Sequence, residues 1–359
     1  MHARKYLFYM HALAGGGAER VWALLASEFA RRGHDVTFAV DFHSPENMDF
    51  LDARVRVVTL PSGHFRAVLG LASLLRREKP DVTLSGIGVS NLKHMLAALM
   101  VFRHRRAVLS FHGFFASEPQ FLSRLGNHLA PVLTRLCGRA VAVSDGLRTA
   151  LIEQHHASAR RVVRIYNPVY TPKDASAVTA ADLAARGPIV LYVGRMHADK
   201  DIPTLLRGFS RVTFPGARLE IVGDGALRGE MEALAASLGI ADRVTFCGYQ
   251  SDPSIAYRRA RVLALTSRRE SFGNVVAEAL EHGLPVVTTA TDGPCEILEH
   301  GRYGTIVGIG DDEALARALD AVLANPGDPA PRIAQAKLFA VDKATEAYLA
   351  LTEEVIREA

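Results

Sequence analysis

The sequence has few cysteines and no long apolar run. Its 359 residues include only three cysteines, Cys137, Cys247 and Cys295, which are too far apart for a CxxC motif and too few for a disulfide framework. Such sparse cysteine is typical of a reducing compartment, so we expect a cytoplasmic protein. A membrane-spanning helix needs about 18 apolar residues. The longest candidate, Leu92 to Phe102, is shorter and contains Lys93, so any membrane contact is expected to be peripheral, on the inner face of the cytoplasmic membrane.

Positive charge is concentrated in the first half of the chain. Residues 1–180 contain 23 Lys and Arg against 13 Asp and Glu, and residues 181–359 contain 19 against 25, so the halves carry +10 and −6. A basic half is typical of proteins that face nucleic acid, an anionic membrane or an anionic substrate, and it also arises as solubility bias without a partner. No stacking or groove-reading motif is present, so nucleic acid is not an expected partner.

One basic region in this half combines cations with apolar residues. Four cations flank the apolar segment 92–102, namely Lys93, Arg103, Arg105 and Arg106, and three phenylalanines follow His112, namely Phe114, Phe115 and Phe121. This composition favours two interpretations equally. The region is either a membrane-docking face whose cations meet anionic headgroups, or a buried helix of a Rossmann-like domain with a solvated basic end.

Apolar strand-like runs alternate with helical patterns in two series. Continuous apolar strands joined by amphipathic helices predict parallel sheets covered on both faces, and therefore an α/β fold with two doubly wound, Rossmann-like domains. We expect the first domain at 1–169 and the second at 188–336, facing each other across a cleft. Residues 170–187 are rich in Ala, Thr, Ser, Asp and Pro and are interpreted as a linker. The amphipathic pattern over 337–359 predicts a C-terminal helix that crosses back to the first domain.

Three glycines follow the first predicted strand and precede a helix at about 18–31. At that position the backbone N–H groups of Gly15, Gly16 and Gly17 and the positive end of the helix can meet an anion, although a tight turn would explain the same residues. Their spacing is not GxGxxG, which argues against a nicotinamide-dependent dehydrogenase.

Another helix in this domain is predicted as one continuous element over 123–136.

Two cations follow the first strand of the second series. Gly194 and Arg195 end the predicted strand, and Lys200 lies in the loop before the next helix. The planar guanidinium of Arg195 and the compact ammonium of Lys200 suit two adjacent phosphates that gain negative charge as a leaving group departs. The alternative interpretation of the same residues is a solvated basic loop. Asp199 and Asp201 form an Asp-x-Asp that suggests a metal site, but carboxylates beside a helix start favour helix capping.

Two glutamates stand eight residues apart in the segment SRRESFGNVVAEALEHG. Glu270 is expected in a loop and Glu278 on the second turn of the following helix, with the backbone N–H groups of Phe272, Gly273 and Asn274 between them. A carboxylate on a helix can bind both hydroxyls of a ribose, one at a helix entrance can meet the hydroxyls of a sugar, and the amides suit phosphate oxygens.

Further residues lie where predicted strands end. Gly223 ends one strand and Phe246, Cys247 and Gly248 end the next, so their backbone groups could line a planar base, although plain turns would explain them equally. His112 ends a strand of the first domain and is followed by a glycine. Most isolated histidines are structural, but this position is suited to a ligand site.

These motifs together resemble glycosyltransferase family 4, in the right order and over nearly the whole chain. They are GGGAER at Gly15, GR at Gly194, KD at Lys200, GDG at Gly223, FCG at Phe246, ESFGNVVAEAL at Glu270, DGPCEIL at Asp292 and YGTIVG at Tyr303. The resemblance implies a GT-B architecture, a nucleotide-sugar donor bound mainly by the second domain, an acceptor bound mainly by the first, and transfer with retention of anomeric configuration. It implies no metal cofactor. We expect a UDP-sugar rather than a GDP-sugar, and a glycan or lipid-linked acceptor in bacterial surface polysaccharide synthesis.

The resemblance also implies roles for individual residues. It implies that Arg195 and Lys200 bind the donor diphosphate and that Glu278 binds the ribose hydroxyls. Glu270 and the amides of Phe272, Gly273 and Asn274 would meet the transferred sugar and the distal phosphate. The base would be lined by Phe246, Cys247 and Gly248, with Gly194 and Gly223 beside the donor. On the other domain, His112 lies beside the sugar and acceptor, and Gly16 and Gly17 close on the phosphates. This sequence departs from many members at Thr266-Ser267, where they have Pro-Ser, and at Cys295, where they have Arg.

The same residues suggest a mechanism without an enzymic nucleophile. An oxygen of the donor phosphate accepts the acceptor proton, while Arg195 and Lys200 stabilise the departing diphosphate and Glu270 positions the sugar. Two other functions keep the same fold, a GT-B epimerase or phosphorylase and a catalytically silent sugar-nucleotide-binding module.

Overall fold

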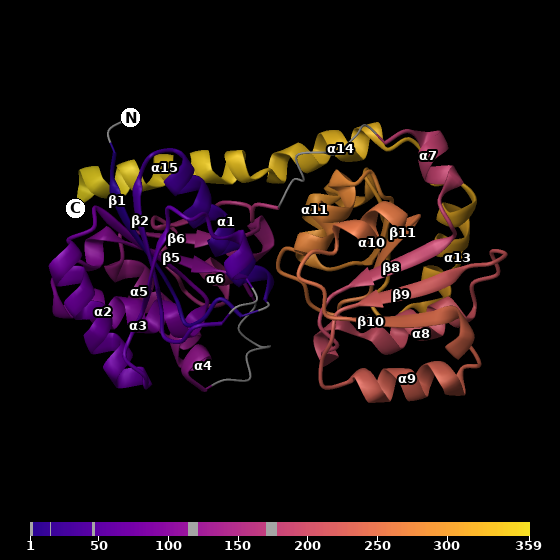
Figure 1. Cartoon of the computed structure of the whole chain (residues 1–359), viewed down its shortest axis with the longest axis horizontal. Coiled ribbons are helices and arrows are strands. Elements are labelled where there is room, and N and C mark those ends of the chain that lie inside the picture. Colours follow the sequence, from indigo (N-terminus) through magenta and orange to yellow (C-terminus); the bar gives the residue numbers. More distant parts are fainter. Residues whose placement is uncertain (1–2, 15, 45–46, 114–120, 170–177) are drawn as a thin grey trace. The chain divides into compact units, whose positions relative to one another are not determined.

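A computed structural model of the chain describes residues 3–14, 16–44, 47–113, 121–169 and 178–359. The chain divides into two compact units, each built around one parallel sheet (Figure 1). Unit 1 comprises Met1–Pro168 together with Val341–Ala359, and unit 2 comprises Val169–Ala340. The predicted fold class, α/β with two doubly wound domains, is confirmed.

Unit 1 contains a seven-stranded sheet in the order β3-β2-β1-β4-β5-β6-β7. Its strands are β1 Lys5–Met10, β2 Asp35–Val40, β3 Arg56–Thr59, β4 Val82–Gly86, β5 Ala107–Phe111, β6 Arg139–Ala142 and β7 Val162–Arg164. Its helices are α1 Gly17–Arg31, α2 His64–Glu78, α3 Gly88–Met100, α4 Phe121–His128, α5 Ala130–Leu136, α6 Asp145–Glu153 and α15 Val341–Glu358. The helices α1 and α15 cover one face of this sheet, and α2 and α3 cover the other (Figure 1).

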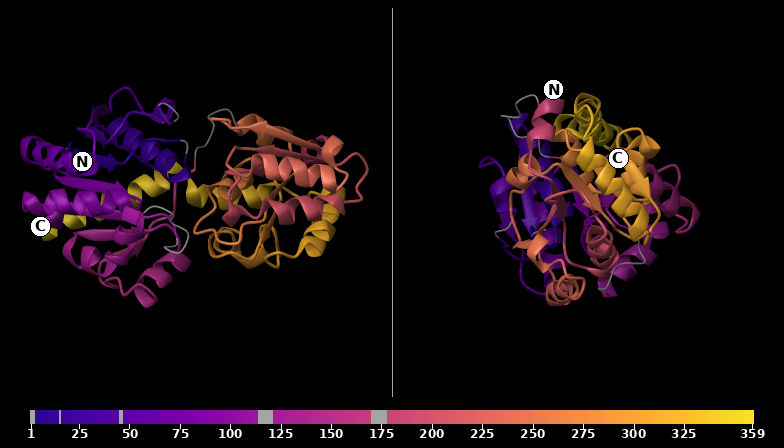
Figure 2. Two further views of the ribbon diagram at one scale, coloured as in Figure 1. Left: turned by 90° about the horizontal axis from the view of Figure 1, so that it is seen from below. Right: turned by 90° about the vertical axis from the view of Figure 1, so that its right-hand side faces the viewer.

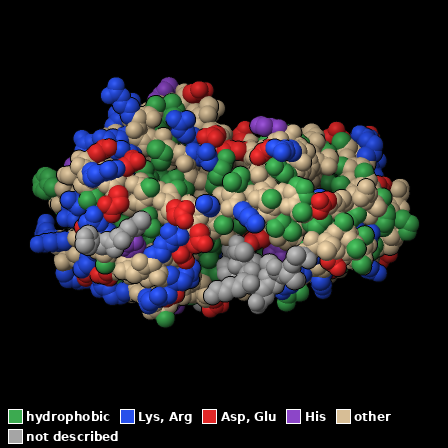
Figure 3. Space-filling model, turned by 90° about the horizontal axis from the view of Figure 1, so that it is seen from above, with side chains coloured by type: hydrophobic (Ala, Val, Ile, Leu, Met, Phe, Trp, Pro, Cys, Tyr) green, Lys and Arg blue, Asp and Glu red, His purple; other side chains and the backbone are tan. Residues whose placement is uncertain are grey.

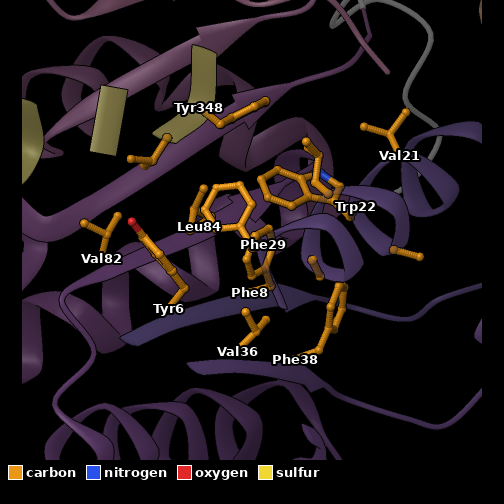
Figure 4. Close-up of a cluster of buried hydrophobic side chains, with 14 of the residues drawn as sticks. Tyr6, Phe8, Val21, Trp22, Phe29, Val36, Phe38, Val82, Leu84 and Tyr348 are labelled. Carbon is orange, nitrogen blue, oxygen red and sulfur yellow. The ribbon is translucent and has the colours of Figure 1, made fainter. Parts of the chain in front are cut away.

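The core of unit 1 is formed mainly by the aromatic side chains of β1 and α1. Apolar residues recur at helical spacing on α1, so that Trp22, Leu25 and Phe29 are fully buried against Phe8 of β1. Tyr348 of α15 joins the same cluster (Figure 4). The C-terminal helix therefore completes the core of unit 1.

Charged side chains fasten α15 at its C-terminal end. The guanidinium of Arg4 donates two hydrogen bonds to Glu353, both 3.0 Å, and Glu358 forms ion pairs with Arg139 and Arg161. The face that carries α15 displays basic and acidic side chains interspersed over unit 1 (Figure 3). The helix begins at Val341 rather than at Lys337, because Ala340 has an extended backbone that separates α15 from the short turn Lys337–Phe339.

The single helix predicted over 123–136 is wrong, because the chain forms two helices that are separated at Leu129. Pro131 lies in the first turn of α5. Proline has no backbone N–H and its ring clashes with the carbonyl four residues earlier, so it is favoured at a helix start and breaks a continuous helix.

Unit 2 contains a six-stranded sheet in the order β10-β9-β8-β11-β12-β13. Its strands are β8 Ile189–Val193, β9 Arg218–Val222, β10 Val244–Gly248, β11 Val262–Leu265, β12 Val286–Thr289 and β13 Thr305–Val307. Its helices are α7 Ala180–Ala185, α8 Ile202–Ser210, α9 Arg228–Ser237, α10 Ser254–Arg259, α11 Asn274–Glu281, α12 Asp292–Ile297, α13 Asp312–Ala324 and α14 Ala330–Ala336. Figure 2 shows helices on both faces of the sheet.

The segment interpreted as a linker is partly helical. Its second half forms α7, which begins with a capping box between Thr179 and Asp182. Arg186 then donates hydrogen bonds to the carbonyl oxygens of Tyr257 and Ala260, at 3.2 and 3.1 Å, which hold this part against unit 2. Residues 180–186 therefore pack as part of unit 2, and residues 170–177 lie outside the described part of the chain. No helix in the described ranges is both long enough and apolar enough to span a bilayer.

Candidate active site

Lys200 and Glu270, seventy residues apart in sequence, form an ion pair in unit 2. Lys200 ends a short turn after β8, and Glu270 lies in the loop between β11 and α11. Both side chains are largely buried, with exposed fractions of 24% and 14%. The hydroxyl of Ser267 also donates to Glu270, at 3.2 Å. The other predicted phosphate ligand, Arg195, is exposed just beyond the end of β8, so the strand places both cations at the same edge of the sheet.

Thr266, which stands where many members of the resembled family have proline, holds the loop that carries Lys200 in place. The Thr266 hydroxyl lies 3.1 Å from the carbonyl oxygen of Lys200 and 3.0 Å from that of Asp201, to which it donates. The hydroxyl of Thr289, at the end of β12, donates to the carbonyl oxygen of Ser267 at 2.6 Å. Proline could not donate such a hydrogen bond, so in this chain a threonine joins β11 directly to the loop that carries Lys200.

The interpretation of Asp201 as a helix-capping side chain is wrong. Asp201 does occupy the position before α8, with a left-handed backbone (φ 45°), but its carboxylate binds no helix amide and pairs with Arg268 at 2.9 Å. Within the described residues, no group of three or more His, Cys, Asp or Glu side chains is placed to hold a metal ion.

Two glycines allow the loops after β8 and β9 to pack backbone against backbone. A Cβ on Gly223 would lie 2.0 Å from the carbonyl oxygen of Gly194, and one on Gly225 would lie 2.5 Å from that of Met196. Gly223 also donates its N–H to the carbonyl oxygen of Gly248, at 2.8 Å. The GDG motif is therefore required for close packing of these loops.

The residues predicted to line a base lie at the end of the edge strand β10. Phe246, Cys247 and Gly248 are all partly exposed, and the pairing of β10 with β9 is irregular between Phe246 and Gly248. Arg228 of α9 lies beside them and donates to the carbonyl oxygen of Phe246 at 3.3 Å. Their contact with a base stays a prediction.

Glu278 is held by a tyrosine that sequence reasoning missed. The buried Tyr257 of α10 donates its hydroxyl to Glu278 at 2.7 Å, and His282 stacks on the tyrosine ring at 5.0 Å. The contact fixes one carboxylate oxygen of Glu278 on a partly exposed helix face. No motif marked Tyr257, because it is separated from Glu278 by a strand and a loop, and only the packing of α10 against α11 brings them together.

The predicted phosphate-binding segment leads into α11, and its contact with phosphate oxygens stays a prediction. Gly273 precedes the helix with a left-handed backbone (φ 86°), Asn274 is its first residue, and Phe272 is buried beneath them. The DGPCEIL segment packs on this loop, since Gly293 donates its N–H to the carbonyl oxygen of Glu270 at 3.1 Å. A Cβ on Gly293 would lie 2.4 Å from backbone atoms of Phe272, so this contact requires glycine.

His112 follows β5 of unit 1 and has a defined protonation state. The indole N–H of Trp22 donates to its Nε2 at 3.2 Å, and the hydroxyl of Ser110 lies 3.0 Å from the same nitrogen. A nitrogen that accepts a hydrogen bond carries no proton. Burial lowers the pKa of His112 to about 3, so the ring is neutral near pH 7. Trp22 was not predicted to belong to the site, because its position on the apolar face of α1 is typical of a core residue.

The glycine loop of unit 1 is described only in part. Gly16 precedes α1 with an extended backbone and Gly17 is the first residue of the helix, whereas Gly15 lies outside the described residues. The side-chain amide of Asn47 donates to the carbonyl oxygen of Ala14 and holds the loop. The N-terminal amides of α1 are therefore at the carboxyl edge of the sheet, as predicted.

Comparisons with known proteins agree with this architecture. The family model described as Glycosyltransferase Family 4 matches residues 15–172, and the model described as Glycosyl transferases group 1 matches residues 180–338. The lipopolysaccharide core biosynthesis glycosyltransferase LpsE of Rhizobium meliloti is 28% identical over 330 residues, which is 88% of each chain. An α-1,4-N-acetyl-D-galactosaminyltransferase of Campylobacter jejuni, named for a diphosphate-undecaprenol acceptor, is 25% identical over 98% of this chain and 99% of its own.

Solved structures show the same fold. Alr3699/HepE from Anabaena, in complex with UDP and glucose, superposes with a TM-score of 0.80 at 21% identity and covers 97% of this chain and 98% of its own. At that identity the likeness establishes the fold, which is GT-B. With two family models that together span most of the sequence, this chain belongs to glycosyltransferase family 4 and is a glycosyltransferase enzyme.

Proposed function

We propose that this glycosyltransferase transfers a sugar from a UDP-sugar to a glycan or lipid-linked acceptor, with retention of anomeric configuration, in the synthesis of a bacterial surface polysaccharide. The observation that carries the proposal is the pair of loops of unit 2 that follow β8 and β11, which carry Arg195 and the Lys200–Glu270 ion pair and the second of which leads into α11, the helix of Glu278. Phosphates, a transferred sugar and a ribose are the ligands that suit these groups. The relatives named above act in lipopolysaccharide core synthesis and on a diphosphate-undecaprenol glycan.

The Lys200–Glu270 pair suggests how the transfer step proceeds. The ammonium of Lys200 is neutralised by the carboxylate of Glu270. A donor diphosphate would compete for Lys200 and leave Glu270 to accept hydrogen bonds from hydroxyls of the transferred sugar. The bond between the anomeric carbon and the phosphate oxygen then breaks as the acceptor oxygen bonds to the same face, and the acceptor proton passes to the departing diphosphate. Lys200 and Arg195 stabilise the charge that develops there.

His112 has a role in this step that does not involve proton transfer. Because burial lowers its pKa to about 3, the ring of His112 is neutral near pH 7. Because Trp22 fixes its Nε2 as an acceptor, we propose that His112 positions the sugar and acceptor as a neutral imidazole. The acid–base work is then left to the donor phosphate itself.

A donor panel tests the proposed function. We expect UDP release from at least one UDP-sugar and much less release from GDP-sugars, with the rate raised by a rough-type lipopolysaccharide core oligosaccharide as acceptor. Release that needs only water or inorganic phosphate would instead indicate an epimerase or phosphorylase. Binding of the nucleotide-sugar without any release of the nucleotide would indicate a catalytically silent sugar-nucleotide-binding module. Tight binding of NADH would instead indicate a nicotinamide-dependent dehydrogenase.

The proposal includes an anionic membrane as a peripheral partner of unit 1. The helices α2, α3 and α4 are neighbours, and the apolar side chains exposed on or beside them are Phe65, Leu69, Leu96, Met100, Phe102 and Leu125. Phe102 is the most exposed of these, at 89%. Exposed arginines lie on or beside the same helices, namely Arg66, Arg76, Arg77, Arg105 and Arg124. Apolar groups bordered by arginines suit a surface of anionic headgroups.

The set of cations predicted for this face needs correction. Lys93 is buried and forms an ion pair with Asp41, so it does not face a membrane. Arg103 and Arg106 are only partly exposed and donate to the carbonyl oxygens of Pro80 and Asp81. Of the four predicted cations, Arg105 alone is classed as exposed. The phenylalanines Phe114 and Phe115 lie outside the described residues, as does the side chain of Phe121.

Co-sedimentation with liposomes tests this part of the proposal. We expect the protein to pellet with anionic vesicles at low salt, to pellet several-fold less with neutral vesicles, and to be released by about 0.5 M salt, roughly threefold the physiological ionic strength of about 0.15 M. The Phe102→Ser, Arg105→Gln double variant should pellet less, and Arg302→Gln in unit 2 is the matched control. Equal recovery in all supernatants would mean that the charge of unit 1 serves solubility only.

A further inference from the structure

The loop that carries Lys200 is fastened to a neighbouring loop of unit 2. The first of these, the β8–α8 loop, comprises residues 194–201, and the second, the β11–α11 loop, comprises residues 266–273. Thr266 is fully buried and directs its hydroxyl to the carbonyl oxygens of Lys200 and Asp201, at 3.1 and 3.0 Å. One side chain therefore binds two successive peptide groups of the β8–α8 loop, and one of them belongs to Lys200 itself.

Arg268 adds two further contacts between the same loops. Its backbone N–H donates to the carbonyl oxygen of Asp199 at 2.8 Å. Its guanidinium forms an ion pair with the carboxylate of Asp201 at 2.9 Å, in which the aspartate side chain is only 5% exposed and the arginine side chain is 57% exposed. A buried carboxylate without a partner is costly, so Arg268 compensates for the burial of Asp201.

These contacts converge on a residue with an uncommon backbone conformation. Asp201 has φ 45° and ψ 49°, which lie in the left-handed region. A residue other than glycine keeps such a conformation only where its surroundings hold it there. Thr266 and Arg268 provide that hold, through the carbonyl and the carboxylate of Asp201. Because Asp201 directly follows Lys200, the same contacts also fix the backbone from which the lysine side chain extends.

We propose that Thr266 and the Arg268–Asp201 ion pair are positioning residues for the neighbouring lysine. They place the Lys200 ammonium where it pairs with Glu270 and where, in the proposed reaction, it stabilises the departing diphosphate. A lysine side chain has many rotamers, so its charge acts at one point only when its backbone and its partner are both fixed. The inference rests on the proposed function, because it explains how the charge assigned to the departing group is held in place.

Removal of the Thr266 hydroxyl tests this role. T266V replaces the hydroxyl by a methyl group of similar size, and the turnover of sugar transfer should fall about tenfold, because a misplaced charge stabilises the transition state less. T266S keeps the hydroxyl and should retain most of the turnover. T345V is the matched control and should behave as the parent. Thr345 is equally buried, but its hydroxyl donates to the carbonyl oxygen of Val341 within α15 of unit 1.

A double-mutant cycle with Lys200 separates positioning from a general loss of structure. K200A has no ammonium to place, so adding T266V to it should change turnover by less than about twofold. R268Q should lower the turnover of the parent less than T266V does, because the backbone N–H of residue 268 still donates to Asp199, and it should have little effect in K200A. A tenfold effect of T266V that persists in the K200A background would overturn the proposal.

Chemical labelling of lysine amines provides a readout that needs no turnover. Lys200 is 24% exposed beside Glu270, so an acetylating reagent should modify it slowly in the parent and at least about threefold faster in T266V, where the side chain is no longer held. The rates are measured by mass spectrometry of peptides. The buried Lys93 and the exposed Lys343, both in unit 1, should react at parent rates in both proteins.

The labelling rates also distinguish failure of this inference from failure of the proposed function. Parent-like labelling of Lys200 in T266V, or an equal increase at Lys93, would overturn the positioning role. Near-normal turnover of K200A would instead contradict the proposed function, and the labelling rates would then decide by themselves whether Thr266 holds Lys200 in place.

Discussion

Lys200→Ala should lower the turnover of sugar transfer by about 100-fold to 1,000-fold, because removing one positioned charge from the departing group typically costs that much. The structure adds a second effect. Glu270 is 14% exposed and would lose its ion-pair partner, so the variant should also be less stable. The measurement is steady-state transfer, together with a melting curve.

A double variant separates these two effects. Glu270→Gln combined with Lys200→Ala leaves no unpaired carboxylate, so stability should recover while turnover stays low. Lys343→Ala, which removes an exposed lysine of α15 that pairs with Glu346, should change neither quantity. Near-normal turnover of Lys200→Ala would contradict the assignment of Lys200 to the departing diphosphate. Recovery of turnover in the double variant would show that the single variant lost turnover through instability.

Glu278→Gln should weaken UDP binding by about 30-fold to 150-fold. A carboxylate that accepts from two ribose hydroxyls makes charge-assisted hydrogen bonds, and loss of the charge costs about 2–3 kcal/mol. Tyr257→Phe should have a smaller effect in the same direction, because the phenol only orients the carboxylate that it contacts at 2.7 Å. The comparison of UDP with 2′-deoxy-UDP should give a smaller preference for the ribose in both variants than in the parent.

The sequence predicted the elements well because their signals are local. Apolar runs with turn residues at their ends identified the strands, and glycines at strand ends marked loops that pack backbone on backbone, as at Gly223. The break at Leu129 was missed, since the apolar pattern continues on both sides of Pro131. The helix α7 was missed because its composition, rich in alanine and threonine, is also typical of a linker.

The supporting residues of the site were not predictable in the same way. Tyr257 and Trp22 contact the candidate site residues Glu278 and His112, which lie 21 and 90 positions away. Each occupies a position that a pattern assigns to the core, and only the packing of distant elements reveals its partner. Lys93 is the clearest case. Its sequence neighbours favoured a membrane face and a buried helix equally, and the structure shows its ammonium buried in an ion pair with Asp41, which follows β2.

The central claim is that unit 2 holds the nucleotide of a UDP-sugar through Glu278 and its neighbours. Calorimetric titration of UDP into the parent, Glu278→Gln and Glu313→Gln proteins tests it most directly, since Glu313 is an exposed residue of α13 in the same unit. We predict that UDP binds the parent and the Glu313 variant equally, binds the Glu278 variant at least about 30-fold more weakly, and binds the parent more tightly than GDP does. Equal UDP affinity in all three proteins would contradict the account.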